Sequence, residues 1–168
     1  APNTNLADIA AAKNSAVIAG ASLGPFLGSR IAVIAGSATA GCPAAGVTNE
    51  FTVPRAAPCT GTLGIGGKRT VRHTSATEGV QISMVNAEHV HDFGAGLLTD
   101  PLRTNLTSNG LTGADAGLAN GFVVLFTNGL KVYLSGDTGL FSEMRTVVRD
   151  FYGVNLAVIN IGDIFTIG

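Results

Sequence analysis

The sequence predicts a layered α/β fold, because helical and buried-strand patterns alternate near the N-terminus and two β-rich runs form a hairpin further along. Residues 5–14 ("NLADIAAAKN") place their apolar side chains on one helical face. Residues 15–20 ("SAVIAG") have the length and composition of a buried strand. Residues 21–30 ("ASLGPFLGSR") predict a second helix, broken by glycine. Such alternation favours helices that cover a sheet.

The middle of the chain is less regular. Residues 31–67 are rich in Ala, Gly, Pro and Thr, which predicts short strands in long loops. A clearer strand follows in "GVQISMVNAEH", where apolar and polar residues alternate up to about Asn86. Residues 94–120 show little periodicity and predict a long surface excursion. Loops of that length usually cover a site.

The C-terminal third has the strongest patterns. Residues 121–137 predict a hairpin across Asn128-Gly129, the pair that best tolerates a type I′ turn. A helix from about Leu140 is expected to bury one apolar stripe on the sheet. That stripe comprises Leu140, Phe141, Met144, Val147, Val148 and Phe151. Residues 154–161 ("VNLAVINI") then predict a further buried strand.

Composition limits the classes of partner. Ten basic and eleven acidic residues nearly balance, and charged residues make up only 12% of the chain. No basic stripe is available for a phosphate backbone, so nucleic acid is not an expected partner. No apolar run approaches the roughly 20 residues that cross a bilayer, so no membrane partner is expected. A small-molecule substrate is the expected partner, and homo-oligomerisation is left open.

Cys42 and Cys59 are the only cysteines. Their spacing allows either a disulfide or two free thiols. A disulfide would stabilise the fold by roughly 3 kcal/mol on the chain-entropy scale. The low charge and a disulfide together would favour a periplasmic or exported location. We find no repeat and no linker, so residues 1–168 are expected to form a single domain.

Residues 86–92 ("NAEHVHD") form the first candidate site. Glu88, His89, His91 and Asp92 gather there behind a strand end. Imidazole and carboxylate are ligands that zinc prefers. The competing interpretation is a solvated loop in which one histidine is held by a hydrogen bond.

Asp137, in "SGDTG", is the second candidate. Its flanking glycines let the backbone turn sharply and let a metal approach the main chain. A structural interpretation explains the same residues, because Asp137 or Thr138 could cap the helix that follows.

Taken in order, these segments resemble a known family. "VQISMVNAEHVHD", "GFVVLFTNGLKVYLSGDTGLFSEM" and "NLAVINIGDIFTIG" are similar to the C-terminal half of metallo-β-lactamase-fold hydrolases. The nearest branch is that of metal-dependent hydrolases related to ascorbate-phosphate lactonase. The resemblance implies an αββα sandwich of two similar halves, incomplete within these 168 residues. The chain would then be part of a larger domain.

The same resemblance implies a chemistry. His89 matches a histidine that binds one metal, and Asp137 matches the carboxylate that bridges two zinc ions. His91 or Asp92 could shift into the ligand position of His89. A hydroxide between two such ions attacks an ester, lactone, phosphodiester or related bond, hydrolytic dehalogenation included.

The chain also departs from the family pattern. The H-x-H-x-D-H motif should precede "LAD", where the sequence reads "APNTN", and a final histidine should follow "FTIG". We therefore expect either a piece of a longer hydrolase or a degenerate relative with a binding or structural role. His89 and Asp137 alone would not hold a two-metal catalytic centre.

Overall fold

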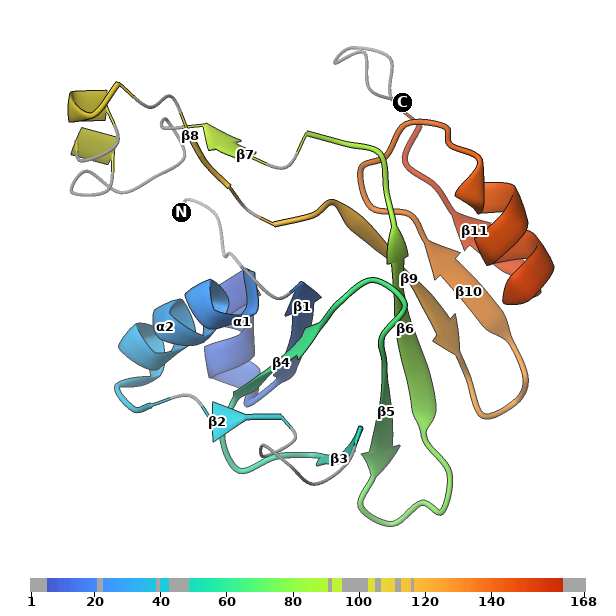
Figure 1. Cartoon of the computed structure of the whole chain (residues 1–168). Coiled ribbons are helices and arrows are strands. Elements are labelled where there is room, and N and C mark those ends of the chain that lie inside the picture. The colour runs from blue at the N-terminus through green and yellow to red at the C-terminus, as the bar shows by residue number, and fades with distance from the viewer. Residues whose placement is uncertain are drawn as a thin grey trace.

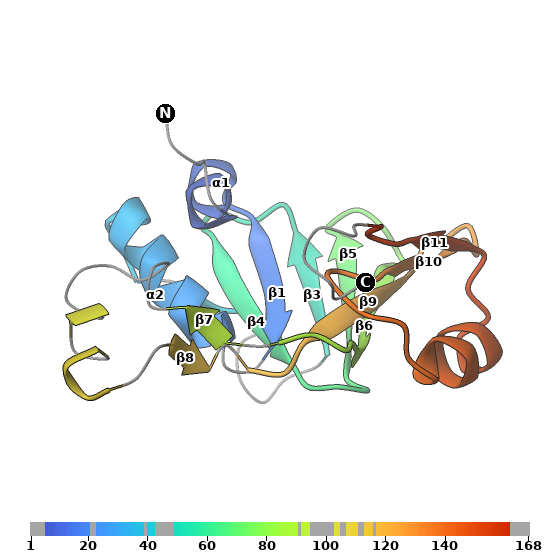
Figure 2. The ribbon, with the colours of Figure 1, turned by 90° about the horizontal axis from the view of Figure 1, so that it is seen from above.

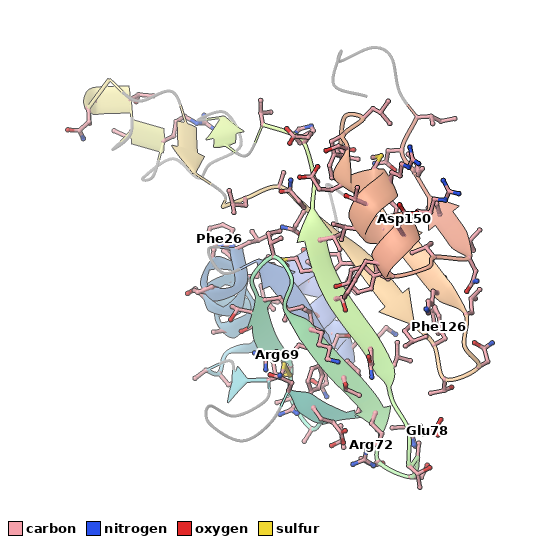
Figure 3. All side chains as sticks on the ribbon, turned by 45° about the vertical axis from the view of Figure 1, so that its right-hand side comes forward. Phe26, Arg69, Arg72, Glu78, Phe126 and Asp150 are labelled. Carbon is pink, nitrogen blue, oxygen red and sulfur yellow. A yellow bond between two sulfur atoms is a disulfide. The ribbon has the colours of Figure 1, made fainter. Side chains whose placement is uncertain are left out.

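Two sheets lie between helices in the computed structural model (Figure 1). The described residues are 6–20, 23–38, 40–42, 49–90, 92–94, 103–104, 107–110, 113–115 and 117–161. Helices α1 and α2 lie outside one sheet, and helix η2 lies outside the other (Figure 2). Phe26 on α2 and Asp150 on η2 accordingly lie on opposite sides of the two sheets (Figure 3). The predicted α/β class and the αββα order of layers are confirmed.

The smaller sheet has three parallel strands in the order β1-β4-β2. Its strands are β1 (Ala16–Gly20), β2 (Ala40–Gly41) and β4 (Cys59–Leu63). Helices α1 (Leu6–Lys13) and α2 (Leu23–Ala35) pack on it. The shared core consists of Ala7, Ala10, Val17, Ala19, Leu27 and Ile31. The expected helix, strand and second helix are thus confirmed.

Helix α2 runs unbroken through its glycines, contrary to the expected glycine break. Gly24 and Gly28 face β4, where a Cβ on Gly24 would overlap the side chain of Thr62. A Cβ on Gly28 would lie 3.1 Å from Thr60 Oγ1. The glycines therefore serve close packing of helix on sheet, and tertiary contact offsets their low helix propensity.

The larger sheet is mixed, with strand order β11-β10-β9-β6-β5-β3. Its strands are β3 (Glu50–Val53), β5 (Lys68–His73), β6 (Val80–Asn86), β9 (Asn120–Leu125), β10 (Lys131–Leu134) and β11 (Leu156–Val158). Parallel pairs join β3 to β5 and β10 to β11, and the other neighbours are antiparallel. The expected strand ending at Asn86 is confirmed. Strand β5 had no counterpart in the sequence analysis.

Helix η2 (Met144–Phe151) begins later than the expected Leu140 and is wound as a π-helix. Tyr152 N–H donates to the carbonyl of Val147, five residues back, at 3.0 Å. This wider turn puts fewer of the expected apolar residues on one face. Val148 is buried against the sheet, whereas Leu140 is 92% exposed and Phe151 is 77% exposed. The predicted stripe is therefore right at its centre and wrong at its ends.

The predicted hairpin is formed by β9 and β10, but its turn is not type I′. Gly129, rather than Asn128, takes a positive φ of 86°. Phe126 and Leu130 close a three-residue loop, and Gly129 N–H donates to the Phe126 carbonyl at 3.0 Å. A type I turn followed by a left-handed glycine gives this arrangement.

Strand β11 lies at an edge of the larger sheet, and all three of its residues are exposed. Leu156 is 50% exposed. The prediction of a buried strand is thus wrong for the described residues, because an apolar run alone does not show whether another layer covers it.

The two cysteines form a disulfide, Cys42–Cys59, which decides between the two possibilities left open above. Both are fully buried with Phe51, and Ile18 and Val71 pack against them. This cluster joins the smaller sheet to the larger one.

The expected excursion at 94–120 contains regular structure. Strand β8 (Gly113–Asp115) pairs with β7 (Asp92–Gly94) in a two-stranded sheet. None of the described helices is long and apolar enough to span a membrane.

Candidate metal-binding site

Three strands of the larger sheet, β6, β10 and β11, have their C-terminal ends on the same side of the sheet. Strands β6 and β10 are both antiparallel to β9, so they run in the same direction, and β11 runs parallel to β10. The segments that follow them are therefore brought together, although they are distant in the sequence. These segments are 87–90, 135–139 and 159–161. Each carries polar side chains.

A pair of hydrogen bonds joins the first two segments. The backbone N–H of Glu88 donates to Thr138 Oγ1 at 2.9 Å. In return, the backbone N–H of Gly139 donates to the carbonyl of Glu88 at 2.7 Å. Thr138 is only 5% exposed, so this polar contact is shielded from water. The bonds fix the Asp137 turn beside the segment that carries His89.

Asp137 is exposed at the tip of this turn. Gly136, just before it, has a backbone φ of 63°, a value that residues other than glycine rarely adopt. Asn160 donates from Nδ2 to Asp137 Oδ1 at 2.6 Å, which orients the carboxylate. The exposed carboxylate keeps acceptor capacity on its second oxygen.

The third segment is fixed to the turn by the buried side chain of Ser135. Ser135 Oγ accepts a hydrogen bond from the backbone N–H of Asn160 at 3.3 Å and donates to the Gly136 carbonyl at 2.7 Å. Ser135 N–H also donates to the carbonyl of Val158 at 3.0 Å. Asn160 is thereby held within reach of Asp137.

His89 is half-buried, and its ring is oriented by the main chain. Nδ1 lies 2.6 Å from the carbonyl oxygen of Val90, a contact that requires Nδ1 to carry the proton. In the neutral ring, Nε2 is then the nitrogen with a free lone pair. Histidines that bind metal commonly donate their other N–H to a backbone carbonyl in this way.

The other predicted ligands are less fully described. His91 lies outside the described residues. Asp92 begins β7, and the described structure does not include its side chain. Among the described residues, no group of three or more His, Cys, Asp or Glu side chains could hold a metal ion. Within the described residues, the fold thus brings together the segments of two candidate donors, His89 and Asp137.

The helix-cap interpretation of Asp137 is wrong. Glu143 is the N-cap of helix η2, and it makes no side-chain capping bond. The helix begins well past the turn, so neither Asp137 nor Thr138 caps it. Instead, Thr138 holds the segment after β6.

Sequence reasoning missed the residues that support this site. Asn160 and Ser135 act through contacts between segments that follow different strands. In the sequence, each is only a polar residue that follows a strand. Polar residues are common at the start of loops, so this pattern did not single them out.

In comparisons with known proteins, three similar proteins are all named metal-dependent hydrolases. The chain is 48% identical over 54 residues to a UPF0173 metal-dependent hydrolase of Methanosphaera stadtmanae, covering 32% of this chain and 23% of that protein. It is 43% identical over 77 residues to the UPF0173 metal-dependent hydrolase of Natranaerobius thermophilus, and the match covers 46% of this chain and 31% of that protein. It is 33% identical over 109 residues to the UPF0173 metal-dependent hydrolase of Methanoculleus marisnigri, and the match covers 60% of this chain and 47% of that protein.

These relatives support a relationship to metal-dependent hydrolases. The chain spans between about a quarter and a half of the length of the three relatives. No protein-family profile matches the chain. No solved structure matches it either.

Proposed function

We propose that this chain supplies part of the metal centre of a zinc-dependent hydrolase of the metallo-β-lactamase type, in the branch related to ascorbate-phosphate lactonase. One observation carries the proposal: the paired bonds between Glu88 and the Thr138–Gly139 turn, which hold the segments of His89 and Asp137 at one sheet edge. The relatives, which are named metal-dependent hydrolases, support the same class.

The donor chemistry of both residues fits zinc. His89 Nε2 is the free ring nitrogen, because Nδ1 contacts the Val90 carbonyl. Asp137 is an exposed carboxylate with one oxygen held by Asn160. Zinc prefers such nitrogen and oxygen ligands, and a carboxylate can bridge two ions. We propose two zinc ions, with His91 and Asp92 as further candidate ligands.

When bound, zinc would supply Lewis-acid activation of water and of the substrate's electrophilic atom. The residues of this chain would do the positioning. Val90 fixes the His89 ring through its carbonyl, and Asn160 fixes the Asp137 carboxylate through its amide. Thr138 keeps the two segments in register with each other. Preorganisation of this kind spares the site from reordering when a substrate binds.

The proposed substrate is a small molecule with an ester, lactone, phosphodiester or related bond. Hydrolytic dehalogenation belongs to the same proposal. We also propose a periplasmic or exported location, and the disulfide between Cys42 and Cys59 supports it, because such bonds persist in oxidising compartments.

The test combines intact mass, metal content and turnover of the purified protein. Support would be a mass well above 16.9 kDa with about two zinc ions per chain. Turnover of an ester, lactone, phosphodiester or halogenated aromatic substrate should then stop with a chelator and return with zinc. A metal-free, inactive protein of 16.9 kDa would contradict the proposed hydrolase and favour a binding or structural module.

A further inference from the structure

A cavity of about 810 Å³ lies between the two sheets, apart from the candidate metal-binding site. Strand β1 lines one wall, and strands β3, β5, β6, β9 and β10 line the other. His89 and Asp137 are not among the lining residues. Its volume falls within the range of roughly 300 to 1,000 Å³ that is usual for small-molecule sites.

The walls of this inter-sheet cavity are mainly apolar. Alternation along the strands explains this, because successive side chains of β9 point to opposite faces of the larger sheet. Val123 packs under helix η2 with Tyr133, whereas Phe122 and Val124 line the cavity. Ile82 continues the apolar wall on the neighbouring strand β6. A small polar ligand would leave most of this wall in contact with water.

Two cationic side chains, Lys13 and Arg55, and the imidazole of His73 line the cavity at one end of the sheets. Lys13 ends α1 just before β1, Arg55 follows β3, and His73 ends β5. None of the described residues that line the cavity is acidic. Phe122 and Leu134, which pair with each other, line the cavity at the apolar end. The cavity is therefore cationic at one end and apolar at the other.

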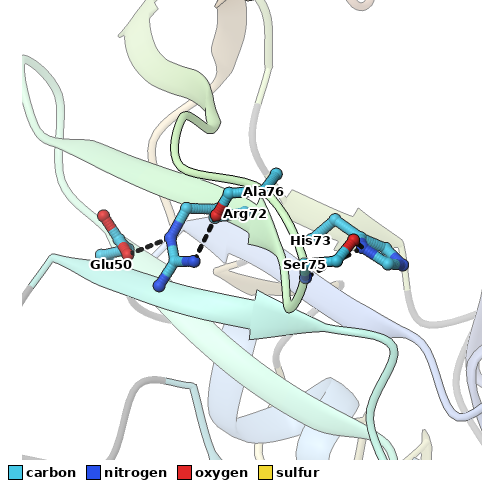
Figure 4. A network of polar contacts seen from close by, with 5 residues as sticks. All are labelled: Glu50, Arg72, His73, Ser75 and Ala76. Carbon is cyan, nitrogen blue, oxygen red and sulfur yellow. Dashed lines mark hydrogen bonds and ion pairs between the residues drawn. The ribbon is translucent and has the colours of Figure 1, made fainter.

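Two neighbouring groups at the cationic end already have partners (Figure 4). Arg72 makes an ion pair with Glu50 at 2.7 Å and donates to the Ala76 carbonyl at 2.6 Å. His73 Nδ1 lies 2.6 Å from Ser75 Oγ. These contacts leave the charge of Arg72 compensated within the sheet.

Arg55 differs from Arg72 in this respect. Its side chain is half-buried, and its Nε is buried without a hydrogen-bond partner among the described residues. A buried, unsatisfied N–H on a guanidinium is costly, and a carboxylate would satisfy it in the forked geometry that arginine favours.

We propose that the inter-sheet cavity binds a long-chain alkyl carboxylate, with the carboxylate on Arg55 and Lys13 and the alkyl chain along Ile82, Phe122 and Val124. The charge of the lining residues selects the anionic head, and the apolar walls select the chain. This proposal does not depend on the metal-binding site.

Calorimetric titration with dodecanoate, below its micelle concentration and with EDTA present, tests the proposal. We expect saturable one-to-one binding, and roughly tenfold weaker binding of decanoate because two fewer CH₂ groups are buried. Dodecyltrimethylammonium, with the opposite charge, should bind at least tenfold more weakly. Absence of saturable dodecanoate binding, or equal affinity for the ammonium compound, would overturn the proposal.

Two pairs of variants locate the ligand. Arg55→Gln should weaken dodecanoate binding at least tenfold, whereas Arg30→Gln, at an exposed position of α2, should leave it unchanged. Val124→Phe should reduce binding by filling the cavity, and the matched Val33→Phe on exposed α2 should not. Circular dichroism would check that each variant is folded. If Arg55→Gln and Val124→Phe both bind as tightly as the parent chain, the ligand lies elsewhere and the proposal is wrong.

Discussion

Thr138 Oγ1 accepts a hydrogen bond from the backbone N–H of Glu88 across 50 residues of sequence, at 2.9 Å. The returning bond from Gly139 N–H to the Glu88 carbonyl makes the contact reciprocal. Through this pair the fold fixes the Asp137 turn beside the segment of His89. The side chains of His89 and Asp137 take no part in these two bonds, so the bonds leave both side chains available to a ligand.

Replacing Thr138 with Val should weaken both the fold and the site. Valine has nearly the same shape but offers no acceptor, so the part-buried Glu88 N–H loses its partner. The free energy of unfolding should fall by about 1–3 kcal/mol in urea titrations. Thr138→Ser retains the oxygen and serves as the control. Equal stability of the valine variant and the parent chain would contradict the role given to Thr138.

Asn160→Ala should lower the affinity of the chain for zinc by about tenfold, because partners that orient a metal ligand commonly contribute that much. The lost contact is the bond from Nδ2 to Asp137 Oδ1. Asn128→Ala, in the hairpin loop at the other end of β10, is the matched control. Zinc calorimetry on both variants measures the difference, and equal losses in the two would count against positioning by Asn160.

Removal of the disulfide by the double change Cys42→Ala and Cys59→Ala should lower the free energy of unfolding by about 3 kcal/mol. The two residues are 17 positions apart and fully buried at the junction of the two sheets. Urea unfolding of the parent chain, with and without a reducing agent, provides the comparison. Unchanged stability in both experiments would mean that the bond does not constrain the unfolded chain.

Tyr133 should make the protein less stable in alkali. It is 1% exposed, burial raises the pKa of its hydroxyl above 10.0, and that hydroxyl has no hydrogen-bond partner among the described residues. The unfolded chain therefore loses this proton at a lower pH than the native protein, so the free energy of unfolding falls as pH rises above about 10.

The variant Tyr133→Phe should remove that part of the alkaline loss while changing stability at pH 8 by only about 1 kcal/mol. Urea titrations at pH 8, 10 and 11 would measure it, with Tyr152→Phe as the control at a half-buried tyrosine. An identical pH dependence in the parent chain and Tyr133→Phe would refute this assignment.

Local patterns were sufficient to predict much of the fold. Alternation in "GVQISMVN" predicted β6, and the run around Asn128-Gly129 predicted the hairpin, because both signals depend on neighbouring residues. The predicted type I′ turn was wrong, because that turn requires a positive φ at both Asn128 and Gly129, and only Gly129 has one. The exposure of Leu156 could not be foreseen, because it depends on which layers pack beside β11.

The candidate site was predictable in part. Asp137 stood out through its flanking glycines, and His89 through its place behind a strand end. The bond between Glu88 and Thr138 and the bond between Asn160 and Asp137 were not predictable. Both join segments that only the order of strands in the sheet brings together.

We propose above that His89 and Asp137 bind the same metal centre. The most direct measurement is a zinc titration followed by the NMR signal of the His89 imidazole Nε2, in the parent chain and in Asp137→Asn. We predict a saturable shift of the His89 signal whose midpoint moves to at least tenfold higher zinc in Asp137→Asn. A His89 signal that does not respond to zinc, or that responds with the same midpoint in both proteins, would contradict the claim.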